Sequence, residues 1–533
     1  MTLRNAGKLS GVLHLGGTTW ALVALSLACA VPVAAESSTA ERPSFSFTET
    51  RAFNPKDVPA YKGSSPRAAA YIKANKDKHV AALQRWVRQP SISAQDIGVN
   101  DMAEMLRDDL KALGFKEAEI VPTRRHPGVW GYYDAGAQTT LAVYMMYDVQ
   151  PIELTGWKVD AFAGELVDHE LGKVLMARGA ANQKGPQRAF LNALEAVIAT
   201  EQKLPINIML LAEGEEELGS PHYPDLIAHY ADRMKSADGV IFPWFHQSPS
   251  GAVSMPLGAK GNIYFELEAK GGAQGGPKTA EIHSSLKAIV DSPGWRLSQA
   301  LAALTSPDGN TIIVRGYYDS IRQPNAEEQR LINGMLPGWT AREGEMRKSL
   351  GVDKWIEGMS GRDSLTQYLS NTTLNIDGIW GGYSGPGSKT ILPHKFTAKL
   401  DSRLVPNQTP EESLHLIRAH LDAKGFTDIK LTLLSGYKPA QTSVESKFVQ
   451  ATIGTYNKYG LPLDVSPRIA GSAPHYVFTD TLKLPMVSVG IGYGAGAHAP
   501  NEFIVIDPKP DSKIAGLIEA EIFYVDLLHA LAK

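Results

Sequence analysis

Continuous hydrophobic runs alternate with amphipathic segments between residues 140 and 243. The runs 140–146 and 206–212, and a third near Val240, have the apolar character of buried strands. The segments 184–203 and 224–234 carry apolar residues at helical spacing. Strand and helix in alternation predict an α/β domain whose parallel sheet is covered by helices on both faces.

The pattern changes after Gly258 to strict alternation of apolar and polar residues, as in 263–269 and 396–401. Between these strands and the strand 429–434, Thr409, Pro410 and Glu412 have the spacing of a helix start with a capping box. These features predict a small open α+β sheet, inserted into the larger domain.

The α/β rhythm returns near Thr442, with a helix at 448–459, a strand at 486–489 and a helix at 515–531. The predicted organisation is a catalytic domain in two parts, an inserted domain between them, and a Ser-, Pro- and Ala-rich linker at 36–65. The predicted boundaries are 66–257 for the first catalytic part, 258–437 for the insertion and 438–533 for the second catalytic part.

The first 35 residues have the features of a secretory signal peptide. Arg4 and Lys8 precede an apolar run from Trp20, and Val33-Ala34-Ala35 is a small-residue cleavage pattern. A single membrane anchor is the alternative, but the run is short for a span and ends at Pro32. We therefore expect an exported protein, periplasmic or secreted, with no membrane association after cleavage. Cleavage would also remove Cys29, the only cysteine, which excludes disulfides and cysteine catalysis.

Charge and composition exclude several classes of protein. The 533 residues contain 53 Lys and Arg against 56 Asp and Glu, so the formal net charge is -3. Nothing in that balance predicts a nucleic-acid partner, which requires a basic face. Hydrophobic residues make up 43% and charged residues 20%, which is typical of globular domains and excludes collagen, long coiled coils and bulk disorder.

Four motifs follow one another at domain-sized spacing, and together they resemble a known family. They are Tyr144-Met145-Met146-Tyr147-Asp148-Val149-Gln150-Pro151, the segment 178–185, the acidic run 213–220 and Gly496-Ala497-His498-Ala499-Pro500-Asn501-Glu502. This series resembles the dizinc metallopeptidase family of carnosine dipeptidases, carboxypeptidase G, aminoacylase and succinyl-diaminopimelate desuccinylase. The resemblance covers nearly all of the chain from about residue 66. It implies a zinc-peptidase-like α/β/α catalytic domain with an inserted α+β, ferredoxin-like lid and dimerisation domain.

The resemblance also implies roles for single residues in the catalytic domain. Glu216 matches the general base that acts on a metal-bound water. Glu217 and His498 match two ligands of the first metal. Asp148 matches the aspartate that orients a histidine ligand of the second metal.

In the inserted domain, the resemblance implies substrate contacts. Arg403 matches the arginine that binds a substrate carboxylate, and Ser472 with Gly471 lies in a loop that assists it. His283 matches a histidine that reaches the partner subunit's site in dimeric relatives and stabilises the oxyanion there. A homodimer and a small-molecule or short-peptide substrate are therefore expected.

Three positions depart from the family pattern. Met146 stands where a histidine is expected, Asn182 replaces the bridging aspartate, and Trp244 lies where the second metal's carboxylate should follow its strand. Zinc sites use imidazole, thiolate or carboxylate ligands, and a thioether has little affinity for such a dication. The sequence therefore predicts a degraded metal centre that holds one zinc or other divalent metal weakly, or none. Replacement ligands from His222, His246 or His475 are an alternative.

Three functions remain open at this point. The protein is an amide or peptide hydrolase with a degraded dimetal centre, a metal-independent acid–base enzyme (hydrolase, lyase or isomerase), or a non-catalytic binding relative. For the second function, Glu216, Glu217, His283, His498 and Lys184 supply acid–base groups.

Overall fold

The computed structural model describes residues 41–532, so the predicted signal segment 1–35 lies outside the described residues. The helices are α1 (Pro66–Ala74), α2 (Lys76–Arg88), α3 (Val99–Ala112), α4 (Gly185–Glu201), α5 (Tyr223–Met234), α6 (Pro293–Ala302), α7 (Ala326–Leu350), α8 (Gly361–Ser370), α9 (Pro410–Ala423), α10 (Lys447–Lys458) and α11 (Leu517–Leu531). The strands are β1 (Glu117–Val121), β2 (Gly128–Tyr133), β3 (Thr140–Met146), β4 (Glu165–His169), β5 (Gly172–Met176), β6 (Asn207–Glu213), β7 (Gly239–Pro243), β8 (Val253–Pro256), β9 (Gly258–Lys270), β10 (Ile282–His283), β11 (Asn375–Gly381), β12 (Ile391–Leu392), β13 (Lys395–Leu404), β14 (Lys430–Tyr437), β15 (Ala440–Gln441), β16 (Leu463–Ser466), β17 (Ile469–Ser472), β18 (Met486–Val489), β19 (Gly494–Ala495) and β20 (Phe503–Pro508).

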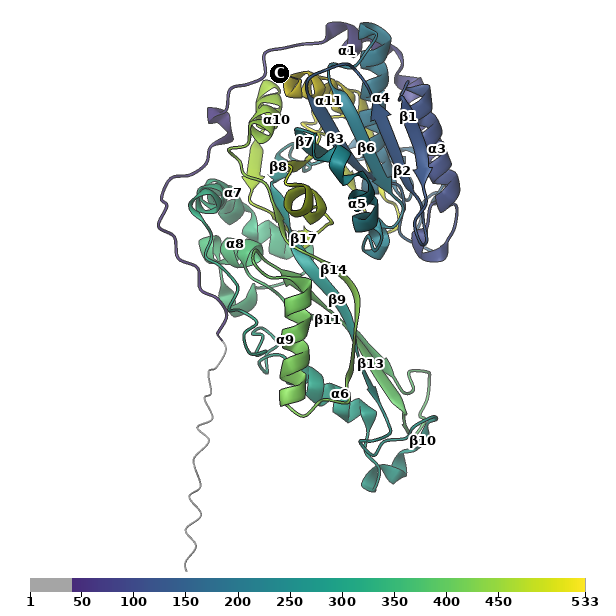
Figure 1. Cartoon of the computed structure of the whole chain (residues 1–533), viewed down its shortest axis with the longest axis vertical. Helices are drawn as coiled ribbons and strands as arrows, with labels where there is room; N and C mark the ends of the chain where they lie inside the picture. The colour runs from purple at the N-terminus through teal and green to yellow at the C-terminus, as the bar shows by residue number, and fades with distance from the viewer. Residues whose placement is uncertain (1–40, 533) are drawn as a thin grey trace, which may run out of the picture. The chain divides into compact units, whose positions relative to one another are not determined.

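The first sheet has the strand order β1-β2-β6-β3-β7-β18 (Figure 1). Strands β6, β3, β7 and β18 are parallel, which confirms the predicted parallel core. At one edge, β1 and β2 form an antiparallel hairpin, and β2 is antiparallel to β6. The sequence analysis predicted neither β1 nor β2, and the short connection between them allows only an antiparallel return.

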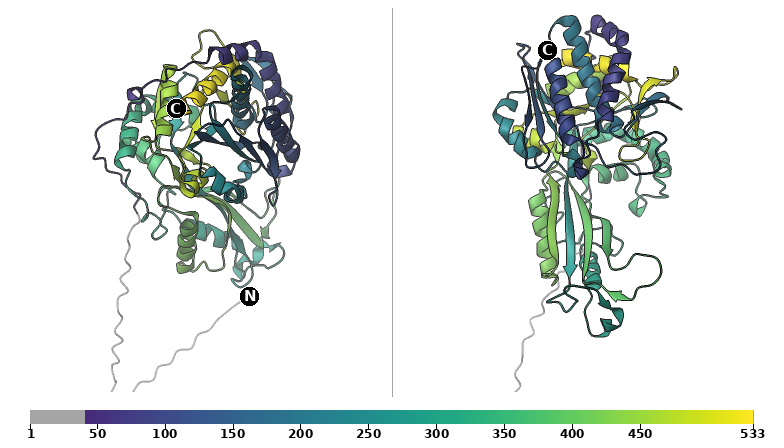
Figure 2. Two further views of the ribbon diagram at one scale, coloured as in Figure 1. Left: turned by 45° about the horizontal axis from the view of Figure 1, so that its top comes forward. Right: turned by 90° about the vertical axis from the view of Figure 1, so that its right-hand side faces the viewer.

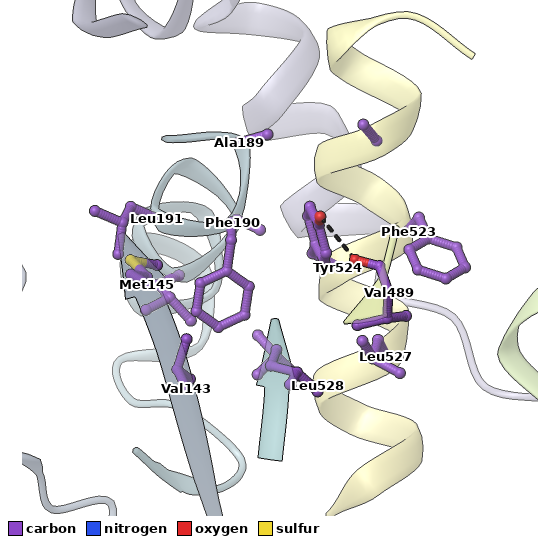
Figure 3. Close-up of a cluster of buried hydrophobic side chains, with 14 of the residues drawn as sticks. Val143, Met145, Ala189, Phe190, Leu191, Val489, Phe523, Tyr524, Leu527 and Leu528 are labelled. Atoms are coloured by element: carbon purple, nitrogen blue, oxygen red, sulfur yellow. Dashed lines mark hydrogen bonds between the residues drawn. The ribbon is translucent and has the colours of Figure 1, made fainter. Parts of the chain in front are cut away.

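Helices cover both faces of this sheet, as its continuous apolar strands require. From β3, Leu141, Val143 and Met145 face a core built with α4 and α11. Figure 3 shows Val143 and Met145 near Phe190 of α4, with Phe523 and Tyr524 of α11 beyond. The alternate residues of β3, which include Tyr144 and Met146, face a second core built with α5.

The inserted domain contains a second sheet, in which β11, β13, β9 and β14 are neighbours. Ile263, Phe265 and Leu267 of β9 lie in a core with α6 and α9, which follow one face of this sheet (Figure 2). Thr409 caps α9 as predicted, since its hydroxyl accepts a hydrogen bond from the Glu412 amide at 3.2 Å. The predicted small α+β sheet is therefore present in the insertion.

Strand β9 joins the insertion to the rest of the chain. Its first residues pair with β15 and β17, and from Gly261 onward it pairs with β13 and β14. The insertion also contains the helix pair α7 and α8, which the sequence pattern did not reveal. Residues 41–65, predicted as a linker, include Phe47, which packs against the cluster of Ile332, Leu365 and Leu369 on these two helices.

A buried lysine lies at the start of β9. The Lys260 ammonium donates to the carbonyl of Asn371, just beyond α8, at 2.6 Å, and only 2% of the residue is exposed. Burial, and then the positive charges of Arg468 and Arg403, lower the pKa of Lys260 to about 7. A charged lysine at this position therefore opposes folding.

A Lys260→Met variant tests whether burying a charged lysine here lowers the free energy of unfolding. In the unfolded chain the lysine titrates near pH ~10.4, and in the folded protein its pKa is about 7. Between these values the unfolded state binds more protons. The free energy of unfolding of the parent should thus fall relative to the variant as the pH is lowered through this range, by up to about 1.4 kcal/mol per pH unit, and the difference should level off below it. Urea unfolding across the range measures this, with the exposed Lys270→Met as control; a pH-independent difference would show that Lys260 titrates normally.

Candidate active site

The acidic run after β6 forms a turn that a buried carboxylate holds in place. Asp148, just after β3, accepts hydrogen bonds from the amides of Glu216 at 3.2 Å and Glu217 at 3.1 Å. It also accepts one from the Ser93 hydroxyl at 2.7 Å. Burial, and then the charge of Glu217, raise the pKa of Asp148 to about 7. With Met146 in the chain, the partners of Asp148 are these two amides and one hydroxyl, and not a metal-binding histidine.

Glu216 lies on this turn, in the short helix η4 (Glu216–Leu218), and is half-buried. Burial, and then the charges of Glu217, Asp148 and Glu213, raise the pKa of Glu216 well above its usual value. Its carboxylate makes no hydrogen bond to any residue in the described range 41–532. It is therefore the carboxylate of this turn that is available to exchange a proton with a ligand.

Protein amides hold the neighbouring Glu217. The side-chain amides of Asn182 and Gln150 each donate to one of its carboxylate oxygens, both at 2.7 Å. Asn182 Nδ2 also lies 3.0 Å from Nε2 of His498, and that nitrogen is 3.4 Å from Glu217 Oε2. The hydrogen bond with Glu217 is the largest cause that raises the pKa of His498. The structure thus brings Asn182, Glu217 and His498 together, as the motifs predict.

Two residues that the sequence analysis did not single out complete this arrangement. Gln150 lies within the first quoted motif and reaches Glu217 directly. Glu502, which is fully buried and closes the last motif, accepts the backbone amides of Ala181 at 2.9 Å and Asn182 at 2.8 Å and pairs with Arg178 at 2.8 Å. Both residues lie within the quoted motifs, and this position was the signal by which the sequence could have identified them. Glu502 therefore fixes the loop that carries Asn182.

Met146 and Trp244, at two of the positions that depart from the family pattern, take part in hydrophobic packing. Met146 is 1% exposed and belongs to the hydrophobic cluster that also contains Phe242, against which Trp244 packs at 5.6 Å between ring centres. Thioether, carboxamide and indole groups are not the donors that zinc uses. Within residues 41–532, no group of three or more His, Cys, Asp or Glu side chains is arranged to hold a metal. The side chains of Met146, Asn182 and Trp244 therefore do not supply the ligands of a dizinc centre.

Two of the three alternative histidines have polar partners of their own, whereas the buried Nε2 of His475 has no hydrogen-bond partner among residues 41–532. His246 Nε2 contacts the Ser488 hydroxyl at 2.8 Å, and burial lowers its pKa to about 3. His222 Nδ1 lies 2.6 Å from Glu215. His475 is buried against Phe242, and burial lowers its pKa to about 4. These histidines do not form a substitute ligand set.

The inserted domain supplies a cationic group near β17. Arg403 Nη1 donates to the Ser472 hydroxyl at 3.0 Å, and Ser472, which follows Gly471, donates in turn to the Gly261 carbonyl at 2.9 Å. Arg403 also pairs with Asp401 at 3.0 Å, and its side chain is 37% exposed. The predicted pair of Arg403 and Ser472 is thus in contact, with part of the guanidinium open to a ligand.

Two predicted residues have hydrogen-bond partners outside the glutamate turn. His283 is exposed on the inserted domain, where it contacts the hydroxyls of Ser285 at 2.7 Å and Thr390 at 3.2 Å. Lys184 is fully buried, and its ammonium donates to the carbonyls of Trp86 and Gln89. Burial lowers the pKa of Lys184 to about 7. These hydrogen bonds indicate that the Lys184 ammonium stabilises the fold and does not face a ligand.

Comparison with known proteins identifies a matching family and solved structures of similar fold. The pattern of peptidase family M20/M25/M40 matches residues 142–514. A Cys-Gly metallodipeptidase of Schizosaccharomyces pombe is 27% identical over 467 residues, which cover 82% of this chain and 93% of that protein. The crystal structure of an M20 family metallo-carboxypeptidase from Sulfolobus solfataricus superposes with a TM-score of 0.76 and 33% identity, covering 85% of this chain and 99% of that one. Human carnosine dipeptidase 1 superposes with a TM-score of 0.70 and 26% identity, covering 88% and 99%.

Proposed function

The chain belongs to peptidase family M20/M25/M40, and we propose that it hydrolyses the peptide or amide bond of short substrates that carry a free carboxylate. The proposal rests on two groups: the carboxylate of Glu216, which makes no hydrogen bond within residues 41–532 and lies on a fixed turn, and the partly exposed guanidinium of Arg403 on the inserted domain. The relatives named as dipeptidases and as a carboxypeptidase act on substrates of this kind.

In the proposed reaction, separate residues of this chain bind the substrate, transfer the proton and position the general base. Arg403, oriented by Ser472, binds the substrate carboxylate and so sets the position of the scissile bond. Glu216 accepts a proton from the attacking water and returns it to the leaving nitrogen, so that the acid and amine products form without net proton change. Asp148 keeps Glu216 in place through the backbone of the turn.

We further propose that the centre lacks a complete pair of metal ions and holds one divalent ion weakly or none. The support is the chemistry of Met146, Asn182 and Trp244 at the ligand positions. A second candidate, a metal-independent acid–base enzyme on the same fold, is favoured by one contact. The Asn182 amide already lies against both Glu217 and His498, the two residues that would hold an ion of the first site.

A Glu216→Gln variant tests the hydrolase proposal. A panel of dipeptides and N-acetyl amino acids with free carboxylates is assayed for release of amine, with parent and variant compared. The variant should lose turnover by at least about 100-fold, because a neutral amide cannot accept the proton, whereas the exposed Glu165→Gln should not change it. Binding without hydrolysis by the parent would instead identify the non-catalytic relative, and an active variant would exclude Glu216 as the base.

Restoring the ligands tests the proposal on the metal centre. Met146→His combined with Asn182→Asp and Trp244→Asp returns imidazole and carboxylate donors, so zinc affinity measured by calorimetry should rise at least about tenfold. Met146→His alone serves as the control, and circular dichroism checks folding. A chelator should also lower the parent's activity less than that of an ordinary zinc peptidase. Unchanged zinc affinity in the folded triple variant would mean that the parent's ligands were misidentified.

We propose a homodimer in which His283 acts across the interface. The support is its exposure on the inserted domain, where its ring contacts the hydroxyls of Ser285 and Thr390 and no residue of the glutamate turn. A His283→Ala variant should lower kcat at least about tenfold while folding and molecular mass stay unchanged, because a lost oxyanion donor weakens only the transition state. The exposed His415→Ala on α9 is the matched control. Equal kcat in parent and His283→Ala would remove His283 from the site.

Export remains a proposal that the sequence alone supports. N-terminal sequencing of protein from its native host should begin at Glu36 or a close neighbour, because cleavage follows the small-residue pattern Val33-Ala34-Ala35. Intact Met1 on the mature protein would show that the segment is retained. Among residues 41–532 we find no helix long and apolar enough to cross a membrane.

A further inference from the structure

A row of three side chains crosses the inserted sheet at the point where it meets β17. Asn262 of β9 lies directly opposite Arg403 of β13 on one side and Tyr437 of β14 on the other. Residues opposite one another in antiparallel strands project from the same face. Tyr437 therefore extends from the same face as the carboxylate-binding Arg403, about 10 Å away in the backbone, since neighbouring strands are about 4.8 Å apart.

The far end of this row touches the glutamate turn. The Tyr437 hydroxyl would be 3.4 Å from a Cβ atom built on Gly219, and the Ser435 side chain of the same strand would be 2.9 Å from it. Gly219 has a φ of +86° and directly follows η4, which carries Glu216. The close approach of β14 explains why no larger residue fits there. Tyr437 is itself 7% exposed, so its ring is enclosed where the inserted sheet meets the turn.

We propose that the Tyr437 hydroxyl is a further catalytic group, which donates a hydrogen bond to the oxygen of the scissile carbonyl as negative charge develops on it. This inference rests on the proposed hydrolysis. A carboxylate bound by Arg403 leaves the scissile carbonyl one residue further along the substrate, on the way to the glutamate turn. The Tyr437 hydroxyl lies at that turn, beside Gly219 and in hydrogen-bonding contact with the Ser220 side chain. The proton stays on the phenol throughout, so the step adds a hydrogen bond and no covalent change.

The surroundings keep Tyr437 a donor. Burial, and then the negative charges of Glu216 and Glu213, raise the pKa of Tyr437 well above its usual value. The phenol therefore remains protonated at neutral pH and cannot compete with Glu216 as a base. A protonated phenol of this kind can stabilise the oxyanion that forms in the transition state. In a dimetal enzyme, metal ions polarise the scissile carbonyl. Tyr437 would supply part of that polarisation here, because Met146, Asn182 and Trp244 do not provide metal ligands.

A Tyr437→Phe variant tests the role, because it removes only the hydroxyl oxygen and keeps the ring that packs on the turn. With the best-hydrolysed member of the dipeptide panel, kcat should fall about 100-fold or more while KM changes less than about threefold, as expected for a contact made only in the transition state. Ser435→Ala is the matched control, since it alters the other side chain of β14 that touches Gly219. It should leave kcat within about twofold.

Each other outcome overturns the inference in a distinguishable way. If Tyr437→Phe keeps the parent's kcat, Tyr437 is not catalytic although the hydrolase proposal stands. If kcat and KM worsen equally in Tyr437→Phe and in Ser435→Ala, the contact with Gly219 is structural. If the parent hydrolyses no member of the panel, both the proposed function and the role of Tyr437 fail.

Discussion

The buried carboxylate of Asp148 joins three segments of the chain at the carboxyl edge of the first sheet. It follows β3, accepts the amides that open the glutamate turn after β6, and accepts the hydroxyl of Ser93. An acceptor of this kind fixes a turn because each buried amide left without a partner would cost about 1–3 kcal/mol. The positions of Glu216, of Glu217 and of Gly219, which meets β14, all follow from that turn.

A second constraint is the set of amides around Glu217. In a metal centre, dications would offset the negative charge gathered at this edge. Here Asn182 and Gln150 donate to both oxygens of Glu217, His498 lies beside it, and Glu502 holds the loop of Asn182 by its backbone. Glu217 matches a metal ligand of the family motif, but here two neutral amides donate hydrogen bonds to its carboxylate oxygens. These hydrogen bonds fix the position of the Glu217 carboxylate.

The sequence predicted the parts of the fold that local pattern controls. The bounds of β3 and β18 and the start of α9 at Thr409 agree with hydrophobic periodicity and capping chemistry. The antiparallel edge of β1 and β2 and the helix pair α7 and α8 were missed, because strand direction and packing partners depend on contacts far apart in the chain. In the site, the motifs identified Glu217, Asn182 and His498, but Tyr437 lies in no motif and only the strand register reveals it.

The most direct test of the account is the metal content of the protein as its host makes it. Elemental analysis by mass spectrometry, on protein purified without chelator or added zinc, gives the number of divalent ions per chain. We expect well under two ions per chain, because thioether, carboxamide and indole groups are not the donors that zinc uses. Two tightly held zinc ions per chain would contradict the account and would mean that donors outside those assigned here complete an ordinary dimetal centre.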